Sequence, residues 1–367
     1  MLLQGTPGVL DIVRRVWSFL PVVEKLRKLA RRPARSVEEV ASESWEIAPA
    51  FTRVASPALS LPGHWERVTS FSQFSTREGD LRKVRGEEVA NSATRAFRIR
   101  DALLIDGVVY KKDGACLHLH PRTARIPRLR IEQEIERGAV YCTFGGNRYF
   151  GQWLMDDCVT YPLAIAEGVP VTTAQPLNNH TPGYEAWLEM KPVRAAAAFF
   201  RELVVFDDVG QNQSKHARFR GLGQRLRQRV DHRPHPGVFV VRGATGSRRV
   251  LQNEMEIAER LRDRRGFTII DPVKEDVPAI VRASAGAKMV VGVEGSGLIH
   301  GILGLATGGG LLVLQPPHRF SAIFKDLTDR DQQQFGFVVG LARGEDFWLD
   351  PDVVERTLDL FTAPAGS

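Results

Sequence analysis

A glycine-rich turn, VGVEGSGLIHG at residues 291–301, carries the residue types best suited to binding a phosphate. Gly295 and Gly297 have no side chains, so the backbone there can approach a ligand closely. The amides and positive dipole end of a following helix would suit a diphosphate. The turn contains neither the Gly-Lys-Ser/Thr of triphosphatase loops nor the GxGxxG of dinucleotide folds. It therefore indicates phosphate binding, with ordinary turn chemistry as the alternative.

A second stretch, VVRGATGSRRVLQNE at residues 240–254, supplies positive charge. Arg242 ends a predicted strand, while Arg248 and Arg249 precede the next predicted helix. In an open parallel sheet ligands bind beyond the carboxyl ends of the strands, so we expect these arginines near the glycine turn. Guanidinium groups there would neutralise the charge that develops on a departing nucleoside diphosphate. The alternative is that they are ordinary surface arginines.

The elements that must position these residues alternate between strand and helix. In the C-terminal half, four short apolar runs are separated by helical patterns, which predicts a parallel sheet covered on both faces. The four runs are 237–242, 267–271, 288–293 and 309–315.

The N-terminal half shows a similar alternation from residue 139 onward. It follows a hairpin region at 96–120, in which Asp-Gly pairs at 106–107 and 113–114 are typical of tight turns. Residues 36–95 mix charge, Ser and Pro without periodicity, and we expect irregular structure there. The predicted fold class is therefore α/β.

The composition is that of an enzyme-sized globular protein. A chain of 367 residues with 43% hydrophobic content is long enough for two domains. A net charge of +7 suits nucleic acid, an anionic membrane face or a phosphorylated substrate. The basic stretches near the start and at 215–233 carry no nucleic-acid-binding signature, so we expect no nucleic-acid partner.

The cysteines indicate a reducing compartment. Cys116, Cys142 and Cys158 form an odd set without CxxC spacing, and the first thirty residues show no secretory signal, which predicts a cytoplasmic protein. Cys116 alternates with His118 and His120 on one face of a strand, but no fourth ligand has matching spacing. We interpret the trio as strand-face residues and predict neither a metal nor a cofactor.

Two segments raise the question of a membrane. Residues 295–317 lack charge, but seven of them are glycine, which favours a helix end and a buried strand over a bilayer span. Near the start, apolar residues recur at helical spacing beside basic ones; such a helix would lie on an anionic bilayer surface or pack on the protein itself. That stripe comprises Val9, Ile12, Val13, Val16, Trp17, Leu20 and Val23.

The C-terminal motifs resemble those of glycosyltransferase family 61, whose bacterial members are often described as capsular polysaccharide biosynthesis proteins. That family typically has a strand ending in Arg, an Arg and an Asn-Glu pair opening the next helix, and a later turn GxHGAGLTN. The matching positions here are Arg242, Arg249, Asn253, Glu254, Gly292, Gly295, Gly297 and Leu298. The turn departs from the pattern where Glu294 replaces His, Ser296 replaces Ala and His300 replaces Asn.

The N-terminal half resembles the same family through RYFGQWLMDD at 148–157, which is similar to the family's NYYHWLLD. The matching positions are Tyr149, Trp153, Leu154 and Asp156, and Gln152 replaces the usual His. The resemblance covers residues 100–345 and implies a GT-B fold, in which two Rossmann-type domains face a cleft. It implies a donor held by the C-terminal half, an acceptor held by the N-terminal half, and no bound metal; the pairs 156–157 and 207–208 are not a DxD motif.

Asp156 is the predicted general base, because a carboxylate at the interdomain cleft could accept the proton of the acceptor hydroxyl. The alternative is that Asp156 is a helix residue that satisfies local hydrogen bonds, and Glu294 is the competing base. We favour Asp156 because a carboxylate beside a leaving diphosphate would repel it. The predicted acceptor-side residues are Tyr149, Gln152 and Trp153, for which core packing is the alternative to sugar stacking. The predicted donor-side residues are Arg242, Arg248, Arg249, Asn253, Glu254, Gly295, Ser296, Gly297 and His300.

The predicted function is transfer of a sugar from a nucleotide-sugar to a cell-surface polysaccharide or lipid-linked glycan, with peripheral contact to an anionic membrane. The alternatives are an envelope enzyme similar to polysaccharide pyruvyl transferases and a non-catalytic nucleotide- or glycan-binding relative. The predicted organisation is an N-terminal basic and irregular segment, an acceptor-side domain, a donor-side domain and a C-terminal helix. Their bounds are 1–95, 96–233, 234–345 and 346–367.

Overall fold

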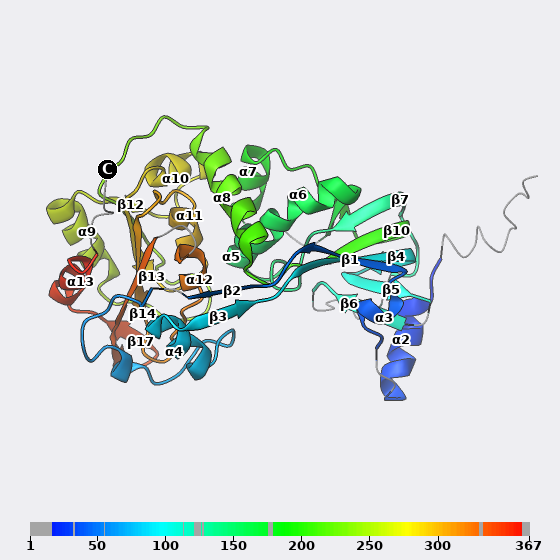
Figure 1. The fold of residues 1–367 in the computed structure, drawn as a ribbon, viewed down its shortest axis with the longest axis horizontal. Coiled ribbons are helices and arrows are strands. Elements are labelled where there is room, and N and C mark those ends of the chain that lie inside the picture. The colour runs from blue at the N-terminus through cyan, green and yellow to red at the C-terminus, as the bar shows by residue number, and fades with distance from the viewer. Residues whose placement is uncertain are drawn as a thin grey trace, which may run out of the picture. The chain divides into compact units, whose positions relative to one another are not determined.

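A computed structural model groups the chain into two compact units, and each unit is built from several segments (Figure 1). Unit 1 comprises Met1–Pro49, Ala93–Asn178 and Glu189–Gly210, and unit 2 comprises Ala50–Ser92, Asn179–Leu188 and Gln211–Ser367. Both contain α/β structure, as predicted. The domain bounds drawn along the sequence stay predictions. The structure describes residues 17–31, 34–54, 56–112, 114–120, 126, 128–174, 179–329 and 333–361.

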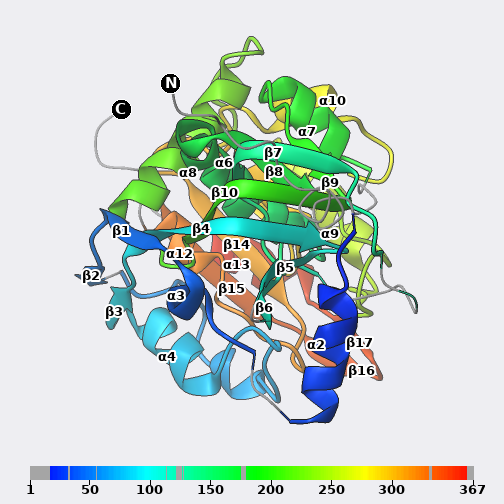
Figure 2. The ribbon, with the colours of Figure 1, turned by 90° about the vertical axis from the view of Figure 1, so that its right-hand side faces the viewer.

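Unit 1 is organised around an eight-stranded mixed sheet, in which β4, β10 and β7 lie side by side (Figure 2). β4 runs antiparallel to β1, β5 and β10, whereas β10, β7, β8 and β9 are parallel. The predicted hairpin at Asp106–Gly107 is confirmed, and both residues have the positive φ of a primed turn. The strands are β1 (Glu43–Ala48), β4 (Thr94–Ile105), β5 (Val108–Lys111), β6 (Gly114–His118), β7 (Gln133–Val140), β8 (Val169–Thr173), β9 (Val193–Ala195) and β10 (Ala197–Asp207).

The helix predicted after residue 148 forms, but it is not uniform. It consists of a short α5 (Phe150–Gln152), a π-helical turn η2 (Trp153–Asp157) and α6 (Cys158–Glu167). Unit 1 also contains α2 (Leu20–Leu29) and α3 (Val37–Val40). Residues 9–16 of the predicted apolar stripe lie outside the described residues.

Unit 2 contains a five-stranded parallel sheet in the order β12-β11-β13-β14-β15. The four predicted strands are confirmed. Three of them, β11, β13 and β14, are almost continuously buried, as in a sheet covered on both faces, whereas the edge strand β12 is exposed at Thr268. The fifth strand, β15, was not predicted. The strands are β11 (Val238–Val240), β12 (Thr268–Ile270), β13 (Met289–Val293), β14 (Gly310–Gln315) and β15 (Gln334–Val339), with a hairpin of β16 (Leu341–Arg343) and β17 (Asp346–Trp348).

Helices follow the strands of this sheet. Val354 and Leu358 of the last helix pack into the same apolar cluster as Ile257 and Leu261. No helix in the described ranges is long and apolar enough to cross a bilayer. The helices are α7 (Thr181–Trp187), α8 (Gln213–Arg227), α9 (Glu254–Arg265), α10 (Val277–Ser284), α11 (Leu298–Ile302), α12 (Lys325–Thr328) and α13 (Pro351–Leu358).

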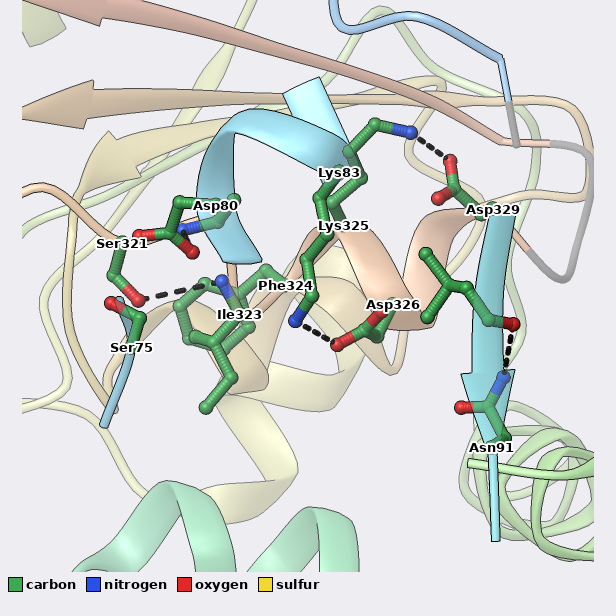
Figure 3. A network of polar contacts seen from close by, with 12 residues as sticks. Ser75, Asp80, Lys83, Asn91, Ser321, Ile323, Phe324, Lys325, Asp326 and Asp329 are labelled. Atoms are coloured by element: carbon green, nitrogen blue, oxygen red, sulfur yellow. Dashed lines mark hydrogen bonds and ion pairs between the residues drawn. The ribbon is translucent and has the colours of Figure 1, made fainter. Parts of the chain in front are cut away.

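The expectation of irregular structure over residues 36–95 was wrong for much of that range. Beyond α3 and β1, it forms β2 (Phe51–Val54), η1 (Trp65–Arg67), α4 (Arg77–Arg85) and β3 (Glu88–Asn91). Ion pairs attach this segment to α12, as the close view of α4 and α12 illustrates (Figure 3). Asp326 lies 3.1 Å from Arg53 and 2.5 Å from Lys83. The segment is therefore held partly by charge pairing, which hydrophobic periodicity cannot reveal.

Candidate functional site

Arg242, Arg249 and Arg319 meet at the carboxyl ends of neighbouring strands in unit 2. Arg242 follows β11, the glycine turn follows β13, and Arg319 follows β14. Arg242 and Arg249 are buried against the turn, because a Cβ atom on Gly295 would lie 3.1 Å from Arg242 Nε and 3.0 Å from Arg249 Nη2. The structure thus brings together two of the predicted arginines and the glycine turn, at the sheet edge where ligands bind in open α/β folds.

Glu294 is the counter-charge of this arginine cluster. Its buried carboxylate Oε2 lies 2.8 Å from Arg249 Nε and 3.7 Å from Arg319 Nε. Arg249 Nε also lies 3.1 Å from the Glu294 backbone carbonyl, to which it donates a hydrogen bond. Glu294 is therefore committed to holding arginine side chains, which weakens its case as the general base.

The loop between β11 and α9 folds around the same cluster. Arg242 Nη2 donates to the Ser247 carbonyl at 2.7 Å, and Arg249 Nη1 donates to the same carbonyl at 3.0 Å. The buried carboxylate of Glu254 accepts from the backbone amides of Arg242 (2.8 Å) and Gly243 (2.7 Å). Burial raises the pKa of Glu254, and the two amide hydrogen bonds oppose that rise. Glu254 thus shapes the loop that carries the arginines.

The electrostatics of the arginine cluster favour an anion. Burial, followed by repulsion from Arg249, lowers the pKa of Arg242 to about 10. Burial also lowers the pKa of Arg249, and the nearby Arg319 adds to that effect. Among the described residues, Arg319 Nε has no hydrogen-bond partner. Three guanidinium groups therefore share two buried carboxylates, Glu294 and Glu254, and a bound phosphate would offset the remaining positive charge.

The predicted contribution of a helix N-terminus is small. The helix after the turn, α11, has only five residues. The amides of residues 298–300 already donate to the carbonyls of residues 295–297. The positive charge of the site therefore comes from arginine side chains more than from helix amides.

Two predicted donor-side residues have other partners. Arg248 is exposed, and its guanidinium pairs with Asp346 at 2.9 Å and Glu345 at 3.4 Å on the β16–β17 hairpin. Asn253 Nδ2 donates to the Leu349 carbonyl at 2.8 Å, which connects the start of α9 to the segment that follows β17. The contacts of Arg248 and Asn253 are thus structural ones.

His300 also has an internal environment. Its ring is buried, with Nδ1 2.7 Å from the Tyr184 hydroxyl, and its centroid lies 4.8 Å from that of His180. Burial, then repulsion from His180, lowers the pKa of His300 to about 3, so the ring is neutral at physiological pH. Ser296, in contrast, is half-buried in the turn itself.

In unit 1, two adjacent carboxylates occupy different environments. Asp157 is fully buried; its carboxylate accepts from the Thr143 amide and hydroxyl and leaves no room for a Cβ atom on Gly146. Asp156 is half-buried in the π-helical turn. Such turns often occur at functional sites. Asp157 therefore has a structural role, whereas Asp156 keeps a position suited to chemistry.

The predicted acceptor-side residues differ in exposure. Trp153 is buried and belongs to the core, as in the alternative to sugar stacking that the sequence left open. Tyr149 is half-buried, and the Arg148 guanidinium lies 5.3 Å from its ring centroid. Gln152 is half-buried and lies against Gly145, where a Cβ atom would approach its Oε1 to 2.3 Å. Tyr149 and Gln152 thus lie half-buried at the start of the helix, and the Oε1 atom of Gln152 is buried.

Sequence reasoning missed three residues of interest. Arg319 follows the apolar run of β14 in the sequence LQPPHR, a strand-end arginine that resembles Arg242 in its local context. Arg148 lies 5.3 Å from the ring of Phe144, which is exposed on the loop after β7. Arg319 is signalled only by its position after a strand, whereas Arg148 lies in the segment RYFGQWLMDD but outside the positions that match the family pattern.

Among the described residues, the His, Cys and Asp side chains that could bind a metal lie in separate places. No group of three or more His, Cys, Asp or Glu side chains within the described residues is arranged to hold a metal. His120 is buried against Gly107, His118 is exposed, and the side chain of Cys116 lies outside the described residues. Asp208 accepts hydrogen bonds from two threonine hydroxyls. The absence of a metal requirement stays a prediction.

The fold is α/β, and a cluster of arginine side chains lies at the strand ends of its parallel sheet. A comparison with protein families matches residues 116–311 to Glycosyltransferase 61, which is more than half of the chain. The chain therefore belongs to glycosyltransferase family 61, and the resemblance seen in its motifs is confirmed. A comparison with curated proteins finds no match. Family membership makes glycosyl transfer the class of its activity.

Proposed function

We propose that this protein transfers a sugar from a nucleoside-diphosphate donor to a cell-surface polysaccharide or lipid-linked glycan. The observation that carries the proposal is the arginine cluster of Arg242, Arg249 and Arg319, whose three positive charges outnumber the two nearby carboxylates, Glu294 and Glu254, at the strand ends of unit 2. A donor diphosphate supplies the negative charge that this cluster lacks. Family membership supplies the class of reaction.

The reaction requires little beyond positioning and charge. The acceptor hydroxyl oxygen bonds to the anomeric carbon of the sugar as the bond from that carbon to the diphosphate breaks. Arg242, Arg249 and Arg319 neutralise the departing diphosphate, which is the charge stabilisation that many transferases obtain from a metal. We therefore propose transfer without a bound metal or cofactor.

Asp156 is the proposed acceptor of the hydroxyl proton. It is half-buried, whereas its neighbour Asp157 and its rival Glu294 are both buried. A base that is already paired with two guanidinium groups cannot take a proton without weakening the arginine cluster. The proposal extends to a GT-B organisation, with donor on unit 2 and acceptor on unit 1, acting in the cytoplasm.

A panel of uridine, guanosine and cytidine diphosphate sugars tests the proposal. We expect one class to raise the melting temperature, because a ligand that binds only the native state stabilises it, and to release free nucleoside diphosphate when acceptor is added. Failure of every donor to shift the melting temperature at millimolar concentration would contradict the proposal. A shift with no release for any acceptor supports the non-catalytic alternative instead.

A further inference from the structure

Helix α2 in unit 1 exposes most of its large apolar residues, and of these only Leu20 packs against an apolar cluster of the described part of the unit. Phe19, Leu26 and Leu29 are 62%, 61% and 81% exposed. In contrast, the buried side of α2 contains Pro21 and Glu24, and Glu24 is only 4% exposed. A surface helix of a globular protein normally buries its apolar stripe and exposes its acids, so the orientation of α2 is reversed.

The exposed residues form one continuous stripe. They recur at the i, i+3, i+4 and i+7 spacing of a single helix face, and Trp17, which precedes the helix, is also exposed. A contiguous exposed apolar patch on a soluble protein is typical of an interaction site. The stripe comprises Phe19, Val22, Val23, Leu26 and Leu29.

The charges beside this stripe all have one sign. Lys25, Lys28 and Arg31 are exposed, whereas Glu24, the single acid between residues 17 and 31, is buried. A protein partner of ordinary surface composition would offer both signs of charge. An apolar stripe flanked by basic residues matches instead the two layers of an anionic bilayer surface, acyl chains below and phosphate headgroups above.

We propose that α2 binds the surface of an anionic membrane, with the stripe inserted among the acyl chains and the basic residues among the headgroups. The proposal goes beyond the transferase function and does not depend on it, because it concerns a surface that takes no part in the sugar transfer. It would hold the enzyme beside lipid-linked acceptors. A second copy of this chain and the chain's own residues 1–16 are the competing occupants.

Vesicle flotation of the full-length protein without donor or acceptor tests this membrane site. We expect the chain to float with phosphatidylcholine vesicles that contain phosphatidylglycerol, to float much less with phosphatidylcholine alone, and to dissociate as salt rises. Leu26→Asp combined with Leu29→Asp should lower the ratio of bound to free protein about tenfold or more. Ile165→Asp is the matched control, because Ile165 is an exposed apolar residue of α6 in the same unit.

A second double variant, Lys25→Glu with Lys28→Glu, keeps the stripe and reverses the flanking charge, and it should also lose the preference for anionic vesicles. The proposal is overturned if the wild-type chain stays out of the vesicle fraction, or if both double variants float as the wild type does. Light scattering identifies the competing occupant: a dimer that Leu26→Asp converts to monomer assigns the stripe to a second copy. A monomer that floats only after removal of residues 1–16 assigns it to that segment.

Discussion

Replacing Gly295 by alanine tests the geometry of the arginine cluster at its tightest point. Gly295 has φ of +148°, a backbone conformation that residues with a side chain rarely adopt. The strain alone should lower the free energy of unfolding by about 1–3 kcal/mol. The new Cβ would also lie 3.0 Å from Arg249 Nη2 and 3.1 Å from Arg242 Nε, so both guanidinium groups must move by a few tenths of an ångström.

The displacement should weaken nucleoside diphosphate binding as well as stability. A hydrogen bond to a charged group is worth about 1.5–3 kcal/mol, so the loss of one such contact predicts an affinity lower by about tenfold or more. Gly297→Ala is the matched control, because Gly297 has φ of −63° and no atom lies within 4 Å of its Cβ position. It should change stability by less than about 0.5 kcal/mol.

Urea unfolding and a nucleoside diphosphate titration of both variants measure the two effects. Equal stability and equal affinity of Gly295→Ala and wild type would refute the assigned backbone and arginine geometry. Equal losses in both variants would show that the turn tolerates no side chain anywhere, and would remove the specific role of Gly295.

Three further predictions concern the carboxylates and the buried histidine. Asp156→Asn should lower turnover about a hundredfold with donor affinity unchanged, whereas Asp157→Asn should lower the melting temperature; normal turnover of Asp156→Asn would remove it as base. Glu294→Gln breaks the buried ion pair with Arg249 and should lower the free energy of unfolding by about 3 kcal/mol. Added nucleoside diphosphate should restore part of that stability. Intact stability with lost turnover would instead make Glu294 the base. Unfolded His300 takes up a proton near pH 6.5 but folded His300 only near pH 3, so the stability that comes from its neutral ring is present above pH 6.5 and is lost as the pH falls towards 3. His300→Asn should reduce this loss in acid unfolding curves. An unchanged pH dependence would contradict the buried, neutral state of His300.

The parallel sheet of unit 2 could be predicted because most of its strands are buried on both faces. Each confirmed strand is a short apolar run between turn residues, and the order of strand and helix then limits the topology. The fifth strand was missed although β15 is also apolar, because the helix before it, α12, has only four residues and leaves no helical pattern in the sequence. Residues 50–92 were missed because ion pairs such as Arg53–Asp326 join segments far apart in the sequence.

The site was predictable only in part for the same reason. Arg242, Arg249 and the glycine turn share a recognisable local pattern, and the structure brings them together. Arg319 joins them only because β14 lies next to β13 in the sheet. A local sequence pattern does not reveal which strands are neighbours. Arg248 is next to Arg249 in sequence, yet its guanidinium turns to the β16–β17 hairpin, since Asp346 offers it a partner there.

Calorimetric titration of nucleoside diphosphate into Arg319→Gln and Arg248→Gln tests the central claim most directly. Both variants remove one guanidinium from the same unit, but only Arg319 faces Glu294 in the arginine cluster. We predict that Arg319→Gln weakens binding about tenfold or more, while Arg248→Gln binds as the wild type does. Equal affinities for all three proteins, or a larger loss in Arg248→Gln, would contradict the claim that this arginine cluster holds the donor diphosphate.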